Sequence, residues 1–294
     1  MRSPQDVNVL ITGAGRGIGK RLALGFSHTR AKIGLLGRSQ GELDVTRLEI
    51  EDSGGTAIRL RADVRNFDQM AAAVDRMTRE WGDIHVLIAN AAVQGPIGPF
   101  AESRPALWQE VFETNVMGVM NSCRAVLPKM LERRAGKIIV ISGQGAGSPR
   151  PRFAAYASSK AAIVRFVECV AEEVRDDNVQ MNCMFPGETY TSMTDEILHA
   201  GEKAGVHEIE AAEKVQVTGG TLSDKQIQLA LFLASERSNH LTGKLIYVQD
   251  DWKKFEHESA PQPVVPMVFR LERPGRAAGG GRGSVKFLVR PRFL

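Results

Sequence analysis

The sequence has no long apolar run, and none of its uninterrupted apolar stretches approaches the roughly 18 residues that a membrane-spanning helix needs. Residues 1–6 also lack the apolar stretch of a secretory signal peptide. Only three residues are cysteine, and their spacing contains no Cys-x-x-Cys pair that would indicate a metal site or a redox pair. These absences predict a cytoplasmic protein with no membrane association, no metal ligands, and reduced core thiols at Cys123, Cys169 and Cys183.

An excess of charge of either sign is also missing from most of the chain. There are 38 Lys and Arg residues against 34 Asp and Glu residues, and the surplus of four lies entirely in residues 256–294. Residues 1–255 hold 31 charges of each sign and are neutral overall. The basic pI of about 9.0 therefore describes a tail, and it gives no reason to expect nucleic-acid binding.

The tail, residues 256–294, is rich in proline, glycine and arginine. This composition predicts a disordered extension. A hairpin is the alternative, because apolar and polar residues alternate at 267–271 and again at 285–289 on either side of a glycine-rich stretch. Such a hairpin would pack on a neighbouring subunit or cover the mouth of a pocket.

Short runs of valine, isoleucine and leucine alternate with longer stretches of helical period in residues 1–255. This alternation predicts a single α/β domain with a doubly wound, seven-stranded parallel sheet and helices on both faces. The expected strands are residues 7–11, 32–36, 57–61, 84–89, 137–141, 179–184 and 244–248. The expected helices are residues 18–29, 41–52, 66–81, 105–134, 153–176 and 224–234.

Residues 190–220 break this alternation. Only residues 193–200 are helix-prone there, and glycines flank and follow them. We expect an insertion with one short helix that moves as a lid and excludes water from a substrate site.

The first expected strand runs directly into a glycine-rich turn at residues 12–19, Thr-Gly-Ala-Gly-Arg-Gly-Ile-Gly. Such a turn lets backbone amides approach a pyrophosphate, and the helix that it opens adds partial positive charge. At the end of the second strand, where a site for NAD usually has an acid, the sequence reads Gly37-Arg38-Ser39. Arg16 and Arg38 can each pair with a 2′-phosphate, which favours NADP(H) over NAD(H), although either could be a solvated surface charge.

Tyr156 and Lys160 lie one turn apart on the same face of an expected helix. A nearby cation favours the phenolate, so the pair suits general acid/base chemistry near neutral pH. A Tyr/Lys pair on a helix usually lies on the surface and has no catalytic role. The glycine-rich turn in the same sequence is what makes a catalytic role the better interpretation here.

Together these residues resemble the short-chain dehydrogenase/reductase family, most of all its 3-oxoacyl-[acyl-carrier-protein] reductase-like members. The resemblance covers roughly residues 7–247 and implies a Rossmann fold that transfers a hydride between a nicotinamide and a carbonyl/alcohol pair. The matching residues, in the family's order, are the turn at 12–19 (TGxxxGxG), Asp63, Asn90-Ala91, Asn115, Tyr156 with Lys160 (YxxxK), and Pro186-Gly187 with Thr191.

The resemblance also implies roles for single residues. Tyr156 would be the general acid/base, Lys160 would lower its pKa and hold the nicotinamide ribose, and Asn115 would support a water leading to Lys160. The cofactor-binding residues would be Gly13, Arg16, Gly17, Ile18, Gly19, Arg38, Ser39, Asp63, Asn90, Tyr156, Lys160, Pro186, Gly187, Thr189 and Thr191.

One departure from the family concerns its catalytic serine, which usually precedes the tyrosine by thirteen positions, where this chain has Gly143. Ser142 lies one residue earlier, and a register shift in the glycine-rich loop would let it serve as the catalytic serine. The alternative is that the role is vacant, or partly filled by Gln144. A second departure, Ala89-Asn90-Ala91-Ala92 in place of Asn-Asn-Ala-Gly, keeps the second asparagine.

The expected helices at 105–134 and 153–176 carry apolar residues around more than one face, which suggests a subunit interface. The resemblance points to a homodimer or homotetramer.

The variable loops expected to line the substrate pocket are mostly apolar or neutral, with no evident carboxylate-binding cluster. An uncharged or weakly polar carbonyl substrate is expected, either a 3-oxoacyl thioester or a small ketone. A second hypothesis, suggested by Gly143 and the tail, is a cofactor-binding but catalytically silent sensor or scaffold; intact Tyr156, Lys160 and Asn115 favour the enzyme. The candidate lining residues are Val93, Gln94, Gln144, Phe153, Tyr190, Met193 and Ile197.

Overall fold

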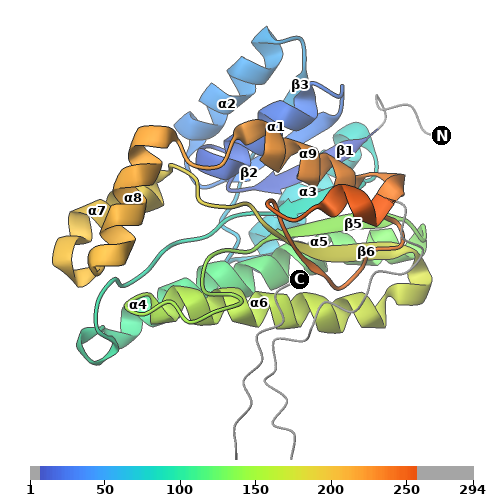
Figure 1. Ribbon diagram of the computed structural model, residues 1–294. Helices are drawn as coiled ribbons and strands as arrows, with labels where there is room; N and C mark the ends of the chain where they lie inside the picture. The colour runs from blue at the N-terminus through green and yellow to red at the C-terminus, as the bar shows by residue number, and fades with distance from the viewer. Residues whose placement is uncertain (1–6, 257–294) are drawn as a thin grey trace, which may run out of the picture. The chain divides into compact units, whose positions relative to one another are not determined.

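Seven short apolar runs form strands, and all seven lie side by side in one parallel sheet (Figure 1). The strand order is β3-β2-β1-β4-β5-β6-β7, so the chain winds outward in both directions from β1 and β4. The computed structural model describes residues 7–256. Every expected strand is present, with ends within two residues of the expected ones. The strands are β1 (Asn8–Thr12), β2 (Lys32–Gly37), β3 (Thr56–Arg61), β4 (Val86–Ala89), β5 (Gly136–Ile141), β6 (Val179–Phe185) and β7 (Leu245–Tyr247).

Helices cover both faces of the sheet, as expected (Figure 1). Alternate residues of a strand point to opposite faces. In β5, Ile138 and Val140 therefore pack with α3, α5 and α6, while Ile139 and Ile141 pack with α1, α2 and α9. The helices are α1 (Gly17–Ser27), α2 (Gln40–Asp52), α3 (Phe67–Trp81), α4 (Pro105–Phe112), α5 (Gly118–Glu132), α6 (Ala154–Glu173), α7 (Ser192–Ala200), α8 (Val206–Thr218) and α9 (Ser223–Ala234).

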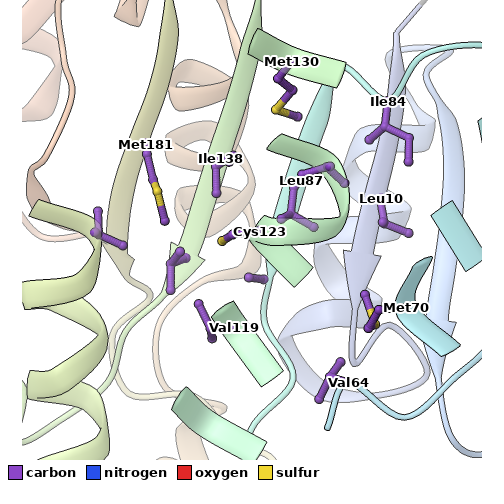
Figure 2. Packing of buried hydrophobic residues seen from close by; sticks show 14 of the residues in the cluster. Leu10, Val64, Met70, Ile84, Leu87, Val119, Cys123, Met130, Ile138 and Met181 are labelled. Atoms are coloured by element: carbon purple, nitrogen blue, oxygen red, sulfur yellow. The ribbon is translucent and has the colours of Figure 1, made fainter. Parts of the chain in front are cut away.

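The core between the sheet and α5 is built from side chains that the helical period places on one face. Figure 2 shows Val119, Cys123 and Met130 of α5 gathered with Leu87 of β4 and Ile138 of β5. All five side chains are almost fully buried. Their burial fixes the ends of β4 and β5, from which the loops of the candidate site emerge.

The helix expected at residues 105–134 is interrupted. A π-helical turn, η3 (Glu113–Met117), separates α4 from α5. Turns of this kind often occur at functional sites, and this one holds Asn115, which is fully buried. Apolar periodicity could not predict the interruption, because the residues on both sides keep a helical pattern.

Residues 190–220 form two helices, α7 and α8, where one was expected. Figure 1 shows them side by side at one end of the sheet. Helix α8 escaped prediction because its apolar residues do not gather on one face, and only Ala212 and Val215 are buried. Both helices cover a small apolar cluster that includes Phe153 and Tyr156.

The cysteines are free thiols, and two of them, Cys123 and Cys183, are buried. Cys169 is exposed, so the prediction of three core thiols is wrong for that residue. Within residues 7–256, no helix is long and apolar enough to cross a membrane. The predicted disordered or hairpin tail lies outside the described residues, except for Glu256, which ends the short helix η7 (Trp252–Glu256).

Candidate active site

The loops that follow the strands at the carboxyl edge of the sheet enclose a cavity of about 620 Å³. Ligands of doubly wound α/β folds usually bind at this edge. Gly19 and Asn115 lie behind the cavity wall, and the other predicted site residues line it. These lining residues are Gly13, Arg16, Gly17, Ile18, Arg38, Ser39, Asp63, Asn90, Ser142, Tyr156, Lys160, Pro186, Gly187, Thr189 and Thr191.

The glycine-rich turn has the geometry of an anion cradle. Gly13 and Gly17 have φ angles of +66° and +56°, which residues with a side chain rarely adopt. Helix α1 begins at Gly17 without a side-chain cap and without an acidic residue in its first turn. Its first backbone amides therefore lack side-chain acceptors and are free to bind an anion, so the turn fits the pyrophosphate of a dinucleotide.

Asn90 holds this turn from behind. Its Nδ2 donates to the carbonyl oxygens of Thr12, at 3.0 Å, and Gly13, at 3.2 Å. Gly19 packs against the same place, and a Cβ on Gly19 would lie only 2.2 Å from the Gly13 carbonyl oxygen. The turn therefore depends on both residues for its shape.

Two predicted arginines lie at the far end of the cavity. A carboxylate that the sequence did not indicate lies there as well. Arg16 and Arg38 line it as predicted, but the first turn of α2 brings in Glu42, whose Oε1 lies 3.6 Å from Arg16 Nη1. Ser39 accepts a hydrogen bond from the Glu42 amide and caps α2. Helix geometry therefore places a carboxylate beside Arg16 that the motif at residues 37–39 did not indicate.

Asp63, one of the expected cofactor-binding residues, is paired with a cation. Its carboxylate lies 2.6 Å from Arg65 Nη2. Hydrogen bonds from Arg65, with a smaller contribution from the charge of Arg38, lower the pKa of Asp63. Asp63 therefore carries a negative charge at neutral pH at the edge of the cavity.

Tyr156 and Lys160 lie at the centre of the cavity, and both are buried. Lys160 Nζ donates to the Ile141 carbonyl oxygen at 2.9 Å and lies 5.5 Å from the centroid of the Tyr156 ring. Burial raises the pKa of Tyr156 to about 12, an effect that the charge of Arg150 opposes, and lowers the pKa of Lys160 to about 8. The charge of Arg150 therefore favours ionisation of Tyr156.

Asn115 is fixed by the loop after β4 and by α6. Its Oδ1 accepts from the Val93 amide at 2.8 Å, and its Nδ2 donates to the Val93 carbonyl oxygen at 2.9 Å and to Ser159 Oγ at 3.0 Å. Asn115 thus joins the cavity wall at Val93 to the helix that carries Tyr156 and Lys160.

Position 143, and not position 142, faces the tyrosine hydroxyl. A Cβ on Gly143 would lie 2.4 Å from Tyr156 Oη, so a side chain at this position would meet the hydroxyl directly. Ser142 lines the cavity with its Oγ buried, but that atom has no hydrogen-bond partner among residues 7–256. The role expected for Ser142 stays a prediction, and the geometry agrees better with the alternative of a vacant serine position.

One end of the cavity lies beside Tyr156, and we call it the substrate end because a substrate is expected there. Its wall contains an ion pair that the sequence did not reveal. Five of the seven candidate lining residues are in the cavity wall, whereas Phe153 and Tyr190 do not line it. The wall also contains Arg150, from the loop after β5, and Glu208, from α8. Because 58 positions separate the two, no local pattern marks them as partners.

Comparisons with known proteins agree with this architecture. A family model described as short chain dehydrogenase matches residues 7–201. The 2,3-dihydro-2,3-dihydroxybenzoate dehydrogenase of Bacillus subtilis (strain 168) is 33% identical over 237 residues, which are 79% of this chain and 90% of that protein. The 3-oxoacyl-[acyl-carrier-protein] reductase FabG of Staphylococcus aureus (strain Mu50 / ATCC 700699) is 26% identical over 242 residues, which are 82% of this chain and 96% of that protein.

Solved structures share the fold along most of the chain. A variant of actinorhodin polyketide ketoreductase, with NADPH, superposes with a TM-score of 0.77 at 26% identity, covering 84% of this chain and 97% of that one. Structures of this fold include chains described as bound to NADPH and to NAD+.

Proposed function

The chain belongs to the short-chain dehydrogenase/reductase family, whose oxidoreductases act on carbonyl and alcohol groups, and from this membership we propose an NADP(H)-dependent enzyme. It interconverts a carbonyl and a secondary alcohol, with Tyr156 as the general acid/base. The observation that carries the proposal is that three features line the same cavity. They are the glycine-rich turn, the buried Tyr156 and Lys160 pair, and two arginines at the far end.

Each residue then has a defined task. A nicotinamide cofactor, held by the glycine-rich turn and Lys160, would supply the hydride for reduction and take it up in oxidation. Tyr156 Oη gives its proton to the carbonyl oxygen in reduction and takes the alcohol proton in oxidation. Lys160 holds the cofactor ribose and, when charged, favours the phenolate that remains. Asn115 keeps the helix of Tyr156 and Lys160 in register with the wall at Val93.

We propose NADP(H) because Arg16 and Arg38 both line the end of the cavity at which a 2′-phosphate would lie. Glu42 opposes this preference by repelling the phosphate. We expect Arg38→Ala to weaken NADPH binding about tenfold or more while NADH binding changes little, because a charged hydrogen bond is lost only for NADPH. We expect Glu42→Gln to strengthen NADPH binding severalfold. Titration calorimetry with both cofactors measures the change.

Arg47→Ala is the matched control for the two variants. Arg47 lies on α2 and pairs with Glu51, at 2.6 Å, and it does not line the cavity. Its substitution should leave both affinities unchanged. If Arg38→Ala weakens NADPH and NADH equally, or neither, the assignment of the 2′-phosphate to this corner is incorrect.

The pKa of Tyr156 gives the reaction a pH dependence of definite sign. Burial raises this pKa to about 12, so the hydroxyl stays protonated at neutral pH and can donate in reduction. Oxidation needs the phenolate, the fraction of which grows about tenfold per pH unit below the pKa. We expect kcat for alcohol oxidation to rise steeply between about pH 7 and 9, while kcat for reduction changes by less than tenfold. Oxidation that is insensitive to pH would exclude Tyr156 as the base.

The silent sensor or scaffold remains the second candidate, because Gly143 stands where the family has its catalytic serine. The two candidates separate in one assay. The purified full-length chain is given NADPH and a panel of ketones and 3-oxoacyl thioesters, and cofactor consumption is followed. The enzyme consumes NADPH with at least one class of carbonyl, whereas the silent relative binds NADPH in calorimetry and turns over none.

We also propose a homodimer or homotetramer. The outer face of η3 and α5 exposes Met117 and Met120, and nearby Phe67 at the start of α3 is exposed as well. Apolar side chains on an otherwise packed layer suit a contact with a second copy. Light scattering after size-exclusion chromatography measures the mass directly.

A further inference from the structure

A buried cation lies at the substrate end of the cavity, close to the reacting hydroxyl. The side chain of Arg150 is only 8% exposed. Its guanidinium carbon lies 3.9 Å from the centroid of the Phe153 ring and 5.7 Å from that of Tyr156. A charge held this deeply loses hydration, so it requires a partner of opposite sign.

The partner in this structure is Glu208. Arg150 Nε and Nη2 donate to its two carboxylate oxygens at 2.9 and 2.6 Å, the paired geometry that a guanidinium offers to any carboxylate. Glu208 is 24% exposed and belongs to α8, one of the two helices that cover the cavity. Its carboxylate can therefore be carried away from Arg150 by a small movement of α8, whereas Arg150 is held by the Phe153 ring.

A second polar group of the cavity wall points independently to a ligand. Gln94 is 2% exposed, and its Nε2 has no hydrogen-bond partner in the part of the chain that the structure describes. A buried amide donor without a partner is costly, and such groups in native proteins usually mark a ligand or water site. Gln94 follows β4 and Arg150 follows β5, two neighbouring strands, and both residues line the cavity.

We propose that the substrate is a short oxo acid or hydroxy acid whose carboxylate binds Arg150 in place of Glu208, with Gln94 donating to an oxygen of the same molecule. This inference rests on the proposed function, and it narrows the substrate class. The 5.7 Å between the guanidinium carbon and the Tyr156 ring places the carboxylate within a few bonds of the reacting carbonyl. This class takes the place of the uncharged or weakly polar substrate expected from the sequence, because Arg150 lines the cavity.

The test compares each oxo acid with its uncharged methyl ester. Short 2-, 3- and 4-oxo acids and their methyl esters are reduced with NADPH, and the acid-to-ester ratio of kcat/KM is measured. We expect the parent to prefer one of the acids, and Arg150→Gln to lower the ratio about 10- to 100-fold, the range expected for a charged hydrogen bond. Glu208→Gln should raise the ratio severalfold, because it removes the competing carboxylate.

Two further variants separate recognition from folding. Arg150→Gln leaves the half-buried Glu208 without its cation, so the double variant Arg150→Gln/Glu208→Gln, which has no charge at this place, should fold and show the same low ratio. Arg152→Gln is the matched control, since Arg152 donates to the carbonyl oxygens of Glu202 and Lys203 and does not line the cavity. It should leave the ratio unchanged.

Binding without turnover distinguishes failure of this inference from failure of the proposed function. Succinate and its neutral diamide are titrated into the protein with NADP+ and followed by saturation-transfer NMR. If no carbonyl is reduced but succinate binds in an Arg150-dependent manner, the proposed function fails and the carboxylate site stands. If esters or ketones are reduced as well as acids, and the double variant changes nothing, the carboxylate site is refuted and the function stands. A preference for a phosphate monoester over every carboxylate also refutes it.

Discussion

In the Tyr156→Phe variant we expect kcat for carbonyl reduction to fall by roughly a thousandfold or more, because the proton donor for the carbonyl oxygen is lost. Phenylalanine keeps the ring that packs near Arg150 and Lys160. Cofactor affinity should change little, since the glycine-rich turn and the arginines at the far end of the cavity are untouched. Steady-state rates together with NADPH titration separate these two effects.

Two variants serve as controls for the loss. Tyr247→Phe removes a hydroxyl from β7, where the ring packs 5.0 Å from the centroid of Phe185 and does not line the cavity, and it should be as active as the parent. In Ser142→Ala we expect kcat to fall by less than about tenfold, because position 143, and not Ser142, faces Tyr156 Oη. The larger loss of kcat is expected only where the proton donor itself is removed. Near-normal turnover by Tyr156→Phe would show that another group carries the proton.

The Gly19→Ala variant should lose cofactor binding and part of its stability together. The new Cβ would lie 2.2 Å from the carbonyl oxygen of Gly13 and 2.6 Å from Asn90 Nδ2. The first of these atoms is backbone, so relief requires the turn itself to move. We expect the dissociation constant for NADPH to rise at least about a hundredfold, and the free energy of unfolding to fall by about 1–3 kcal/mol, as for other overpacked sites.

Gly41→Ala is the matched control for this substitution. Gly41 lies in the first turn of α2, and nothing lies within 4 Å of the Cβ that it would gain. Alanine also favours the helix over glycine by up to about 1 kcal/mol. This variant should bind NADPH normally and unfold at the same or a slightly higher urea concentration. If Gly19→Ala behaves in the same way, the turn does not form the cofactor cradle.

Local sequence patterns were sufficient to predict the sheet and the residues in the middle of the site. Seven short runs rich in apolar residues predicted seven parallel strands, because the central strands are buried on both faces and need a continuous apolar sequence. The glycine-rich turn and the Tyr156 and Lys160 pair were visible for a similar reason, since each is a short motif whose spacing alone fixes its geometry.

What the sequence did not reveal depends on contacts between distant segments. Arg150 and Glu208 meet only because α8 folds back over the loop after β5, and Glu42 reaches Arg16 only because α2 begins beside the glycine-rich turn. Helix α8 was itself missed, because a helix that covers a cavity buries few residues and carries little apolar period. The substrate end and the cofactor-specific corner were for this reason the least predictable parts of the site.

The transfer of the hydride itself tests the central claim most directly. The full-length protein is incubated with NADPH that carries deuterium on the transferring face of C4, together with the panel of oxo acids, esters and ketones, and the alcohol products are analysed by mass spectrometry. We predict an alcohol with one deuterium on its carbinol carbon from the parent protein, and roughly a thousandth of that amount or less from Tyr156→Phe in the same time. NADPH binding without any deuterated alcohol, or equal deuterium transfer by the two proteins, would contradict the account.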